Sequence, residues 1–385
     1  LMTLGTKQQD MHIDPNGIPI VIEGDNSMKM LLYGVVAIFM LVGFVILMKS
    51  NLKSAYALEE STNKGLKPIT LKEEIKLLFD DNIARLFLPL PLIGIILFTV
   101  VPLVYMILIA FTNYDQFHQP PGNLFTWIGL GNFSEIFSSL SSLGKTFWSI
   151  FGWTFIWAIF STFTCYFGGM LLALLINSKG IKGKGFWRTI FVITIAVPGF
   201  ISLLVMRTLL GSQGVINNLL KEFGFITTSL PFLTDVTWAR GTVIVVNMWI
   251  GIPYSMLITS GILLNISREL YESAKLDGAN KFQIFRHITL PYMLFVTTPY
   301  LITNFIANIN NFNAIYFLTK GGPSTLEYYK AGKTDLLVTW LYKLATDSFD
   351  YNYASAIGII IFIISATISL LIYRRSSANK EQGNF

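Results

Sequence analysis

The sequence predicts an all-α integral membrane protein with seven transmembrane helices, and its composition is the first reason. Of the 385 residues, 53% are hydrophobic and only 13% are charged, whereas a soluble domain carries about a quarter charged residues. Apolar runs long enough to cross a bilayer recur along the chain. Lys and Arg gather in the short loops between these runs, which is typical of topology signals rather than of nucleic-acid binding. The single cysteine, Cys165, lies inside an apolar run, so no disulfide framework is expected.

The order of apolar runs and basic loops predicts the topology. The seven spans are expected at residues 31–49, 86–111, 147–176, 189–210, 241–264, 292–318 and 353–373. We expect the fourth to bend at Pro198. The distribution of Lys and Arg places residues 1–30 outside the cell and the following segments in the cytoplasm: 50–84, 178–188, 265–290 and 376–385. An outside N-terminal segment requires a preceding span or signal, and because the first residue is Leu1, we expect the native start to lie upstream.

The cytoplasmic linker 50–84 carries a helix signature ahead of the predicted transmembrane domain, residues 85–375. Thr70 and Glu73 have the spacing of a capping box. Four apolar residues then recur at helical spacing and predict one face of an amphipathic helix along the inner surface: Leu71, Ile75, Leu78 and Phe79.

The most informative stretch is the loop between the fifth and sixth spans, residues 265–290, which we call the coupling loop. Ser267 is placed to cap a helix, and Asp277-Gly278 is typical of a turn. A second helix is expected from about residue 279 to Pro291, where proline would reset the chain into the next span. Its residues resemble the signature of ABC-importer membrane subunits, in which Glu-Ala-Ala, Gly and Ile-x-Leu-Pro follow at fixed spacing. The matching positions are Glu272, Ser273, Ala274, Gly278, Ile288, Leu290 and Pro291, with serine in place of the first alanine.

This resemblance implies that the coupling loop docks on a cytoplasmic ATPase, and the chain itself offers no nucleotide site. Gly144-Lys145-Thr146 echoes the end of a P-loop, but Ser139 stands where the loop needs glycine, and the same holds for Glu327 before Gly332-Lys333-Thr334. None of the three histidines has a Glu or Cys at metal-ligand spacing. We therefore expect no catalytic residue, cofactor or metal on this chain, with ATP and Mg bound by partner ATPase subunits.

The sixth span carries side-chain amides at helical spacing, at Asn304, Asn308 and Asn311. Unpaired amides in hydrocarbon are costly, so this stripe must face protein or a water-filled cavity. One interpretation is hydrogen bonding between helices, worth roughly 0.6 kcal/mol for each bond. The other is a site for a neutral polar ligand such as a sugar, whose hydroxyls also donate and accept. Several aromatic residues nearby offer apolar faces for sugar rings: Trp249, Tyr254, Phe305, Phe312 and Tyr316.

From about Leu86 to the C-terminus the chain resembles the F-type membrane subunit of maltose/maltodextrin ABC importers. The resemblance is carried by Asn247-Met-Trp-Ile-Gly-Ile-Pro-Tyr254, Asn308-Ile-Asn-Asn-Phe312 and Gly321-Gly-Pro323, among other stretches. It implies a six-helix permease core preceded by an extra span. It also implies that the family's sugar-contacting positions correspond to Asn247, Ile250, Gly251, Tyr254, Asn304, Ala307, Asn308 and Asn311. Ile195, Gly199 and Ala307 depart from the family pattern, and the smaller lining suggests a wider cavity.

Together these features predict the transmembrane subunit of an ATP-driven importer of maltodextrin-like oligosaccharides in a bacterial cell membrane. The partners implied by the resemblance are a second homologous permease subunit, two ATPase subunits and an extracellular solute-binding protein. Raffinose-type sugars or glycerol phosphates are the alternative cargoes, although a phosphate ester would want cations in the cavity, and the spans offer only Arg207. The alternative from another class is a stand-alone secondary carrier, which is expected to contain buried coupling carboxylates.

Overall fold

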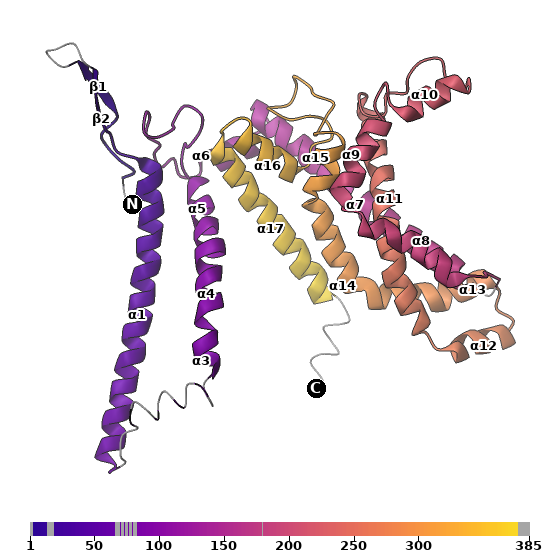
Figure 1. Ribbon diagram of the computed structural model, residues 1–385, viewed down its shortest axis with the longest axis horizontal. Coiled ribbons are helices and arrows are strands. Elements are labelled where there is room, and N and C mark those ends of the chain that lie inside the picture. Colours follow the sequence, from indigo (N-terminus) through magenta and orange to yellow (C-terminus); the bar gives the residue numbers. More distant parts are fainter. Residues whose placement is uncertain are drawn as a thin grey trace. The chain divides into compact units, whose positions relative to one another are not determined.

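The protein is described by a computed structural model that covers residues 3–13, 19–65, 83–178 and 180–375, together with positions 70, 73, 76 and 79. The chain forms two compact units (Figure 1). Unit 1 comprises Leu1–Asn132 and Phe349–Ala356, and unit 2 comprises Phe133–Ser348 and Ile357–Phe385. Among the described residues, six helices are long and apolar enough to span a membrane, and a bent helix pair makes a seventh segment, which confirms the predicted fold class.

Unit 1 holds the first two spans and a feature that the helical prediction missed, a short antiparallel hairpin. Its strands pair Asp10 with Ile22 and Ile13 with Pro19. The elements are β1 (Asp10–Ile13), β2 (Pro19–Ile22), α1 (Ser27–Asn63), α3 (Ile83–Phe87), α4 (Pro89–Ile95), a π-helical segment (Ile96–Val100) and α5 (Val101–Ile109). The last three form one candidate span, Pro89–Ile109. The π-helical segment lies just before Pro102. Its wider turn accommodates the proline, which has no backbone N–H to donate.

Helix α1 is longer than the predicted first span. Asn26 caps its start by accepting from the Lys29 backbone N–H, and the chain leaves it at Gly65, whose φ of +76° is the left-handed conformation that ends many helices. Its 37 residues extend about 55 Å, against roughly 30 Å of hydrocarbon. The first part of the predicted linker 50–84 is thus helical. Residues 50–63 contain neither Gly nor Pro, so nothing in them ends the helix.

Further along the linker, one half of the predicted capping box is present. The backbone N–H and the hydroxyl of Thr70 both donate to the Glu73 carboxylate, at 2.9 and 2.8 Å. Phe79 is exposed. The other three residues of the predicted apolar face, Leu71, Ile75 and Leu78, lie outside the described residues.

Unit 2 is built around the close packing of α7 on α11. A Cβ added to Gly169 would lie 2.5 Å from the Ser255 Cβ, and one added to Gly251 would lie 2.5 Å from the Cys165 sulfur. Small residues thus let the two backbones approach. The pair consists of α7 (Ser142–Asn177) and α11 (Val236–Leu264). The other helices of this unit are α8 (Lys184–Ala196), α9 (Gly199–Leu209), α10 (Val215–Glu222), α12 (Arg268–Leu276), α13 (Lys281–Ile284), α14 (Leu290–Ile309), α15 (Phe312–Leu318) and α16 (Leu337–Thr346). Helices α6 (Gly131–Phe137) and α17 (Tyr351–Arg375) each cross a unit boundary.

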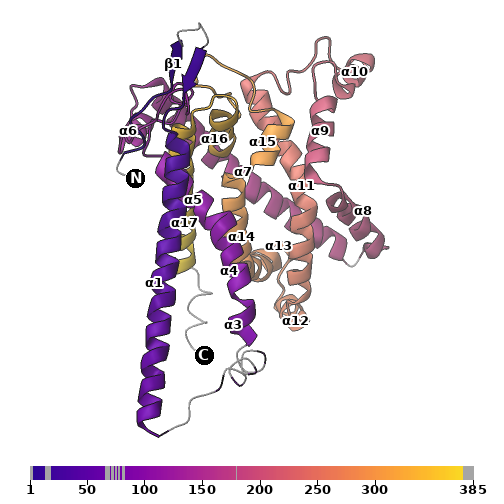
Figure 2. The same ribbon diagram turned by 60° about the vertical axis from the view of Figure 1, so that its left-hand side comes forward.

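The fourth predicted span is two helices rather than one bent helix. Helices α8 and α9 meet at an angle of 89°, visible in Figure 2. Val197 adopts an extended conformation, as the residue before a proline prefers, and Pro198 precedes α9. The expected bend is therefore a full break.

The sixth predicted span, 292–318, is also divided, and its start is earlier than expected. Helix α14 ends at Ile309, and Asn311 caps α15 by accepting from the Ala314 N–H at 3.1 Å. At the other end, α13, a π-helical segment (Phe285–Thr289) and α14 run on as one candidate span from Lys281. The prediction that the helix is interrupted at Pro291 is wrong. Pro291 lies in the first turn of α14 and follows the π-helical segment, and both features accommodate the backbone N–H that proline lacks.

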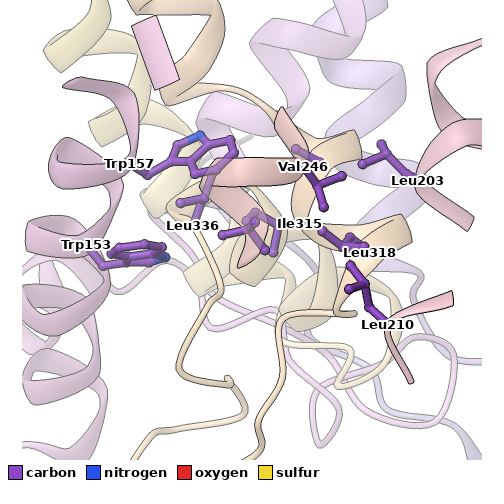
Figure 3. Close-up of a cluster of buried hydrophobic side chains, with 10 residues drawn as sticks. Trp153, Trp157, Leu203, Leu210, Val246, Ile315, Leu318 and Leu336 are labelled. Carbon is purple, nitrogen blue, oxygen red and sulfur yellow. The ribbon is translucent and has the colours of Figure 1, made fainter. Parts of the chain in front are cut away.

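A hydrophobic cluster fixes α15 against α7, α9 and α11. Ile315 and Leu318 pack with Trp153, Trp157 and Val246 among others, as Figure 3 shows. In both Figure 1 and Figure 2, α12 lies at one end of unit 2 and α16 at the other. The coupling loop and the segment after α15 thus lie on opposite sides of the membrane helices, as the charge distribution predicted.

Candidate functional site

The polar residues predicted on α11 and α14 meet on a third helix, α7. Asn308 is 6% exposed, its Nδ2 donates to the Thr162 hydroxyl at 3.0 Å, and its backbone carbonyl accepts from the Trp157 indole at 3.1 Å. Asn247 donates to the sulfur of Cys165 at 3.6 Å. Because Thr162 and Cys165 are three residues apart, they lie on one face of α7. This face joins the two predicted halves of the site.

The three amides of the predicted stripe differ in their surroundings. Asn311 lies beyond the break after α14, so the stripe does not continue along one helix. Its Nδ2 is 3.4 Å from the Oδ1 of Asn308, whose amide therefore has protein partners at both ends. Asn304 is half-buried and makes no side-chain hydrogen bond to any described residue, and Ala307 near it is exposed. In this conformation Asn304 is the amide available to a ligand.

The α11 residues divide between packing and exposure. Gly251 lies against Cys165, and Ile250 packs against the hydrophobic cluster of Figure 3. Tyr254 is 52% exposed, and its ring centroid is 6.3 Å from that of Tyr300, one helical turn before Asn304. The ring of Tyr254 therefore lies beside Tyr300, which precedes Asn304 by one turn of α14.

Sequence reasoning missed the contribution of α7, which it treated as an ordinary span. Trp157, Thr162 and Cys165 contact the predicted polar residues. The sequence feature that could have indicated this role is Thr162 followed by Gly168-Gly169 within a mostly apolar run. Such small residues are enriched where membrane helices pack closely. Among the described residues, no group of three His, Cys, Asp or Glu side chains could hold a metal ion.

The coupling loop has the predicted local structure at its start. The Ser267 hydroxyl accepts from the Glu269 N–H at 3.2 Å, which confirms the predicted cap of α12. Gly278 has a φ of +81°, the left-handed turn that glycine allows. Asn280 and Gln283 then form a capping box that starts α13.

The motif residues of this loop fall into a packed set and an exposed set. Ile288 and Leu290 pack against the cluster around Ile266 and Met293, so their motif positions hold the loop to the helices. Pro291 lies in the first turn of α14, and Ala274 is half-buried. Glu272, Ser273 and Gly278 are exposed, and Leu276 next to them is 89% exposed. The outer face of α12 therefore presents charge and an apolar side chain with no cover from this chain's described residues.

Comparison with known proteins identifies relatives over most of the chain. Residues 166–380 match the family described as the binding-protein-dependent transport system inner membrane component. The maltodextrin transport system permease protein MalC of Streptococcus pneumoniae is 37% identical over 363 residues, or 92% of this chain and 83% of that protein. The galactooligosaccharides transport system permease protein GanP of Bacillus subtilis is 34% identical over 360 residues, or 93% and 85%. A crystal structure of a bacterial ABC transporter involved in the import of the acidic polysaccharide alginate matches 78% of this chain and 97% of that chain, with 26% identity and a TM-score of 0.60.

Proposed function

Because this chain belongs to the family of binding-protein-dependent transport system inner membrane components, and is thus a multi-pass transmembrane subunit of a bacterial ABC importer, we propose that its cargo is a neutral oligosaccharide of the maltodextrin type. The observation that carries this proposal is the uncharged polar site beside α7. Asn304 offers an amide without a side-chain partner among the described residues, and Tyr254 offers an exposed ring beside Tyr300, one turn before Asn304. A sugar needs both, because its hydroxyls donate and accept while its C–H faces are apolar.

A galacto-oligosaccharide is the second candidate cargo, and the similarity to GanP is the observation that favours it. Both sugars are neutral, so the amide and aromatic groups suit either. Glycerol phosphates fit less well, because the proposed site residues carry no cation to bind a phosphate.

We propose that Glu272, Ser273, Ala274 and Gly278 form the surface that docks on a cytoplasmic ATPase subunit, which binds ATP and Mg. The exposure of Glu272, Ser273, Gly278 and Leu276 supports this role, and Ala274 is half-buried among them. A second permease subunit, a second ATPase subunit and an extracellular solute-binding protein complete the proposed complex. ATP-driven motion at the coupling loop would reach the Asn304 site through α14, because α13 and α14 run on through the π-helical segment.

The cargo is tested by deletion and complementation in the native bacterium. Uptake of radiolabelled maltohexaose and of a labelled galacto-oligosaccharide is measured with the chain deleted and then restored from a plasmid. We expect maltohexaose uptake to be lost and recovered while galacto-oligosaccharide uptake is unchanged. The reverse pattern would assign the second cargo, and unchanged uptake of both would refute the proposal.

A further inference from the structure

A row of aromatic rings crosses helices α9, α15 and α16 of unit 2. It begins at Phe200 of α9 and runs through Phe317 and Tyr316 of α15, with ring centroids 5.9 and then 5.6 Å apart. Phe312 stacks on Tyr316 at 4.7 Å, and Tyr342 of α16 lies 4.9 Å from Phe312 and 5.3 Å from Tyr316. Three helices thus contribute rings to one continuous aromatic surface.

Phe317 packs against the hydrophobic core under α15, whereas Phe312, Tyr316 and Tyr342 are not part of it. Helix α15 contributes Ala314, Ile315 and Leu318 to that core, and Ile315 and Leu318 are seen within it in Figure 3. Phe312 and Tyr316 are four residues apart, so they share the remaining face, where both are only half-buried. Tyr342 is 36% exposed. The row therefore offers ring surface that this chain leaves partly open.

The geometry of the three central rings makes a corner. Phe312 and Tyr316 are nearly parallel, at 22°, whereas Tyr342 stands at 68° to Phe312 and 76° to Tyr316. We call Phe312, Tyr316 and Tyr342 the aromatic corner. A pyranose ring matches such a surface, because its C–H face is apolar and its hydroxyls lie at the edge, where the two tyrosine hydroxyls can reach them.

The aromatic corner begins at the residue that follows the predicted amide stripe in the sequence. Phe312 follows Asn311, whose amide contacts Asn308, and Asn304 lies one turn before Asn308 on α14. Tyr342 belongs to the segment between α15 and α17, which the charge distribution places outside the cell. A chain-like ligand held at Asn304 can thus extend outward along the corner.

We propose that the aromatic corner is an outer sugar-binding subsite that holds the distal units of a neutral oligosaccharide whose inner end lies at Asn304. This inference rests on the proposed function, since it requires an oligosaccharide cargo. It makes the transporter sensitive to chain length, because a disaccharide at Asn304 does not occupy the corner whereas a longer chain does.

The test compares two sugars in the complete transporter. Tyr342→Ala removes one wall of the corner, and Tyr342→Phe keeps its ring. Uptake efficiency is measured for labelled maltose and labelled maltohexaose. We expect Tyr342→Ala to lower the efficiency for maltohexaose about three- to tenfold, as for the loss of one aromatic contact, and to leave maltose within about twofold. Tyr342→Phe should keep the wild-type ratio. Trp238→Ala is the matched control, because Trp238 is an aromatic residue of similar exposure that packs on Phe232 outside the corner.

The alternative role for these rings is an anchor in the lipid interface, where aromatic residues are enriched. In that case Tyr342→Ala would reduce the amount or thermal stability of the complex and lower uptake of both sugars equally. Equal losses, or no change in the maltohexaose-to-maltose ratio, would overturn the subsite. If the wild-type complex transported neither sugar, the proposed function itself would fail, which is a different result from an unchanged ratio.

Discussion

Asp335 in the outer segment, residues 319–347, and Glu272 in the coupling loop are both carboxylates between membrane helices, yet their surroundings are opposite. Asp335 is fully buried, and it accepts hydrogen bonds from Lys343 at 2.6 Å, the Gly332 N–H at 2.7 Å and Thr339 at 2.9 Å. Glu272 is exposed. The outer segment uses its charges to hold its own fold, whereas the coupling loop keeps them at the surface.

The same contrast extends to how each segment is attached to the helices. The carbonyls of Thr334 and Lys333 in the outer segment accept from Trp153 of α7 and Arg240 of α11, both at 3.1 Å. In the coupling loop, the Tyr271 hydroxyl shares a hydrogen bond with Thr289 at 3.1 Å, and the apolar motif residues pack below it. The outer segment is therefore a fixed frame, and the coupling loop is anchored on one face and open on the other. Six substitutions in five experiments probe this difference and similar contrasts along α14 and α15, in order of the largest loss of stability expected in each experiment.

Asp335→Ala should cause the largest loss. It leaves the Lys343 ammonium, whose side chain is 17% exposed, without its partner, and a buried charge that loses its partner costs about 3–5 kcal/mol. We expect a clear drop in the thermal unfolding temperature of the purified complex. Adding Lys343→Met should recover part of that loss. Wild-type stability in the single variant would contradict a structural role for the pair.

Asn308→Ala and Asn304→Ala apply the same contrast within one helix. Removing Asn308 deprives Thr162 of its donor, so the expected loss is about 1–2 kcal/mol. Asn304→Ala should leave stability within about 0.5 kcal/mol, since its amide has no partner among the described residues. If Asn304 binds the sugar, the second variant should weaken sugar affinity about tenfold. Thermal unfolding and sugar uptake are measured on both, and Asn304→Ala with unchanged uptake would refute its assignment to the site.

Asn311→Ala separates the remaining role of the predicted stripe. Its side chain caps α15 and approaches Asn308, so its loss should cost about 1 kcal/mol, as for other helix caps. Asn311→Asp is the matched control, because aspartate can keep the cap. Equal stability of the alanine and aspartate variants, measured by thermal unfolding, would show that the cap contributes nothing.

Gly278→Ala should cost roughly 1 kcal/mol, because alanine is strained at the φ of +81° that this position adopts. No neighbouring atom lies within 4 Å of the added Cβ, so the effect comes from the backbone alone. Gly43→Ala in α1, where the added Cβ also meets nothing, is the control. Its lack of strain predicts no loss, and an equal change in both variants would argue against a conformational requirement at Gly278.

Glu272→Lys should have the smallest effect on stability and a large effect on transport. The side chain is exposed, so unfolding should change by less than about 0.5 kcal/mol, while sugar-stimulated ATP hydrolysis of the assembled complex should be lost. Glu222→Lys makes the same charge change at an exposed position of α10 and should leave both quantities unaltered. Normal coupled ATP hydrolysis in the Glu272 variant would remove this residue from the proposed docking surface.

Composition and charge alone located the membrane segments and their order, although not the break in the fourth segment or the bounds of the first and sixth. Hydropathy is a property of each stretch by itself, so residues 147–176 and 241–264 could be identified before any contact was known, and the structure places α7 and α11 around them. The Ser267 cap and the turn at Gly278 were equally local, since each depends on residues within one helical turn.

Only the tertiary structure decided which amide has a side-chain partner on another helix and which has none among the described residues. Asn304 and Asn308 look alike in the sequence, but Asn308 finds Thr162, a residue 146 positions away on α7. The full break at Pro198 and the division of the sixth span before Asn311 also depend on packing, because proline and asparagine tolerate several conformations until neighbouring helices select one. Hydropathy reports the cost of leaving water, whereas hydrogen-bond partners between helices are set by which faces meet.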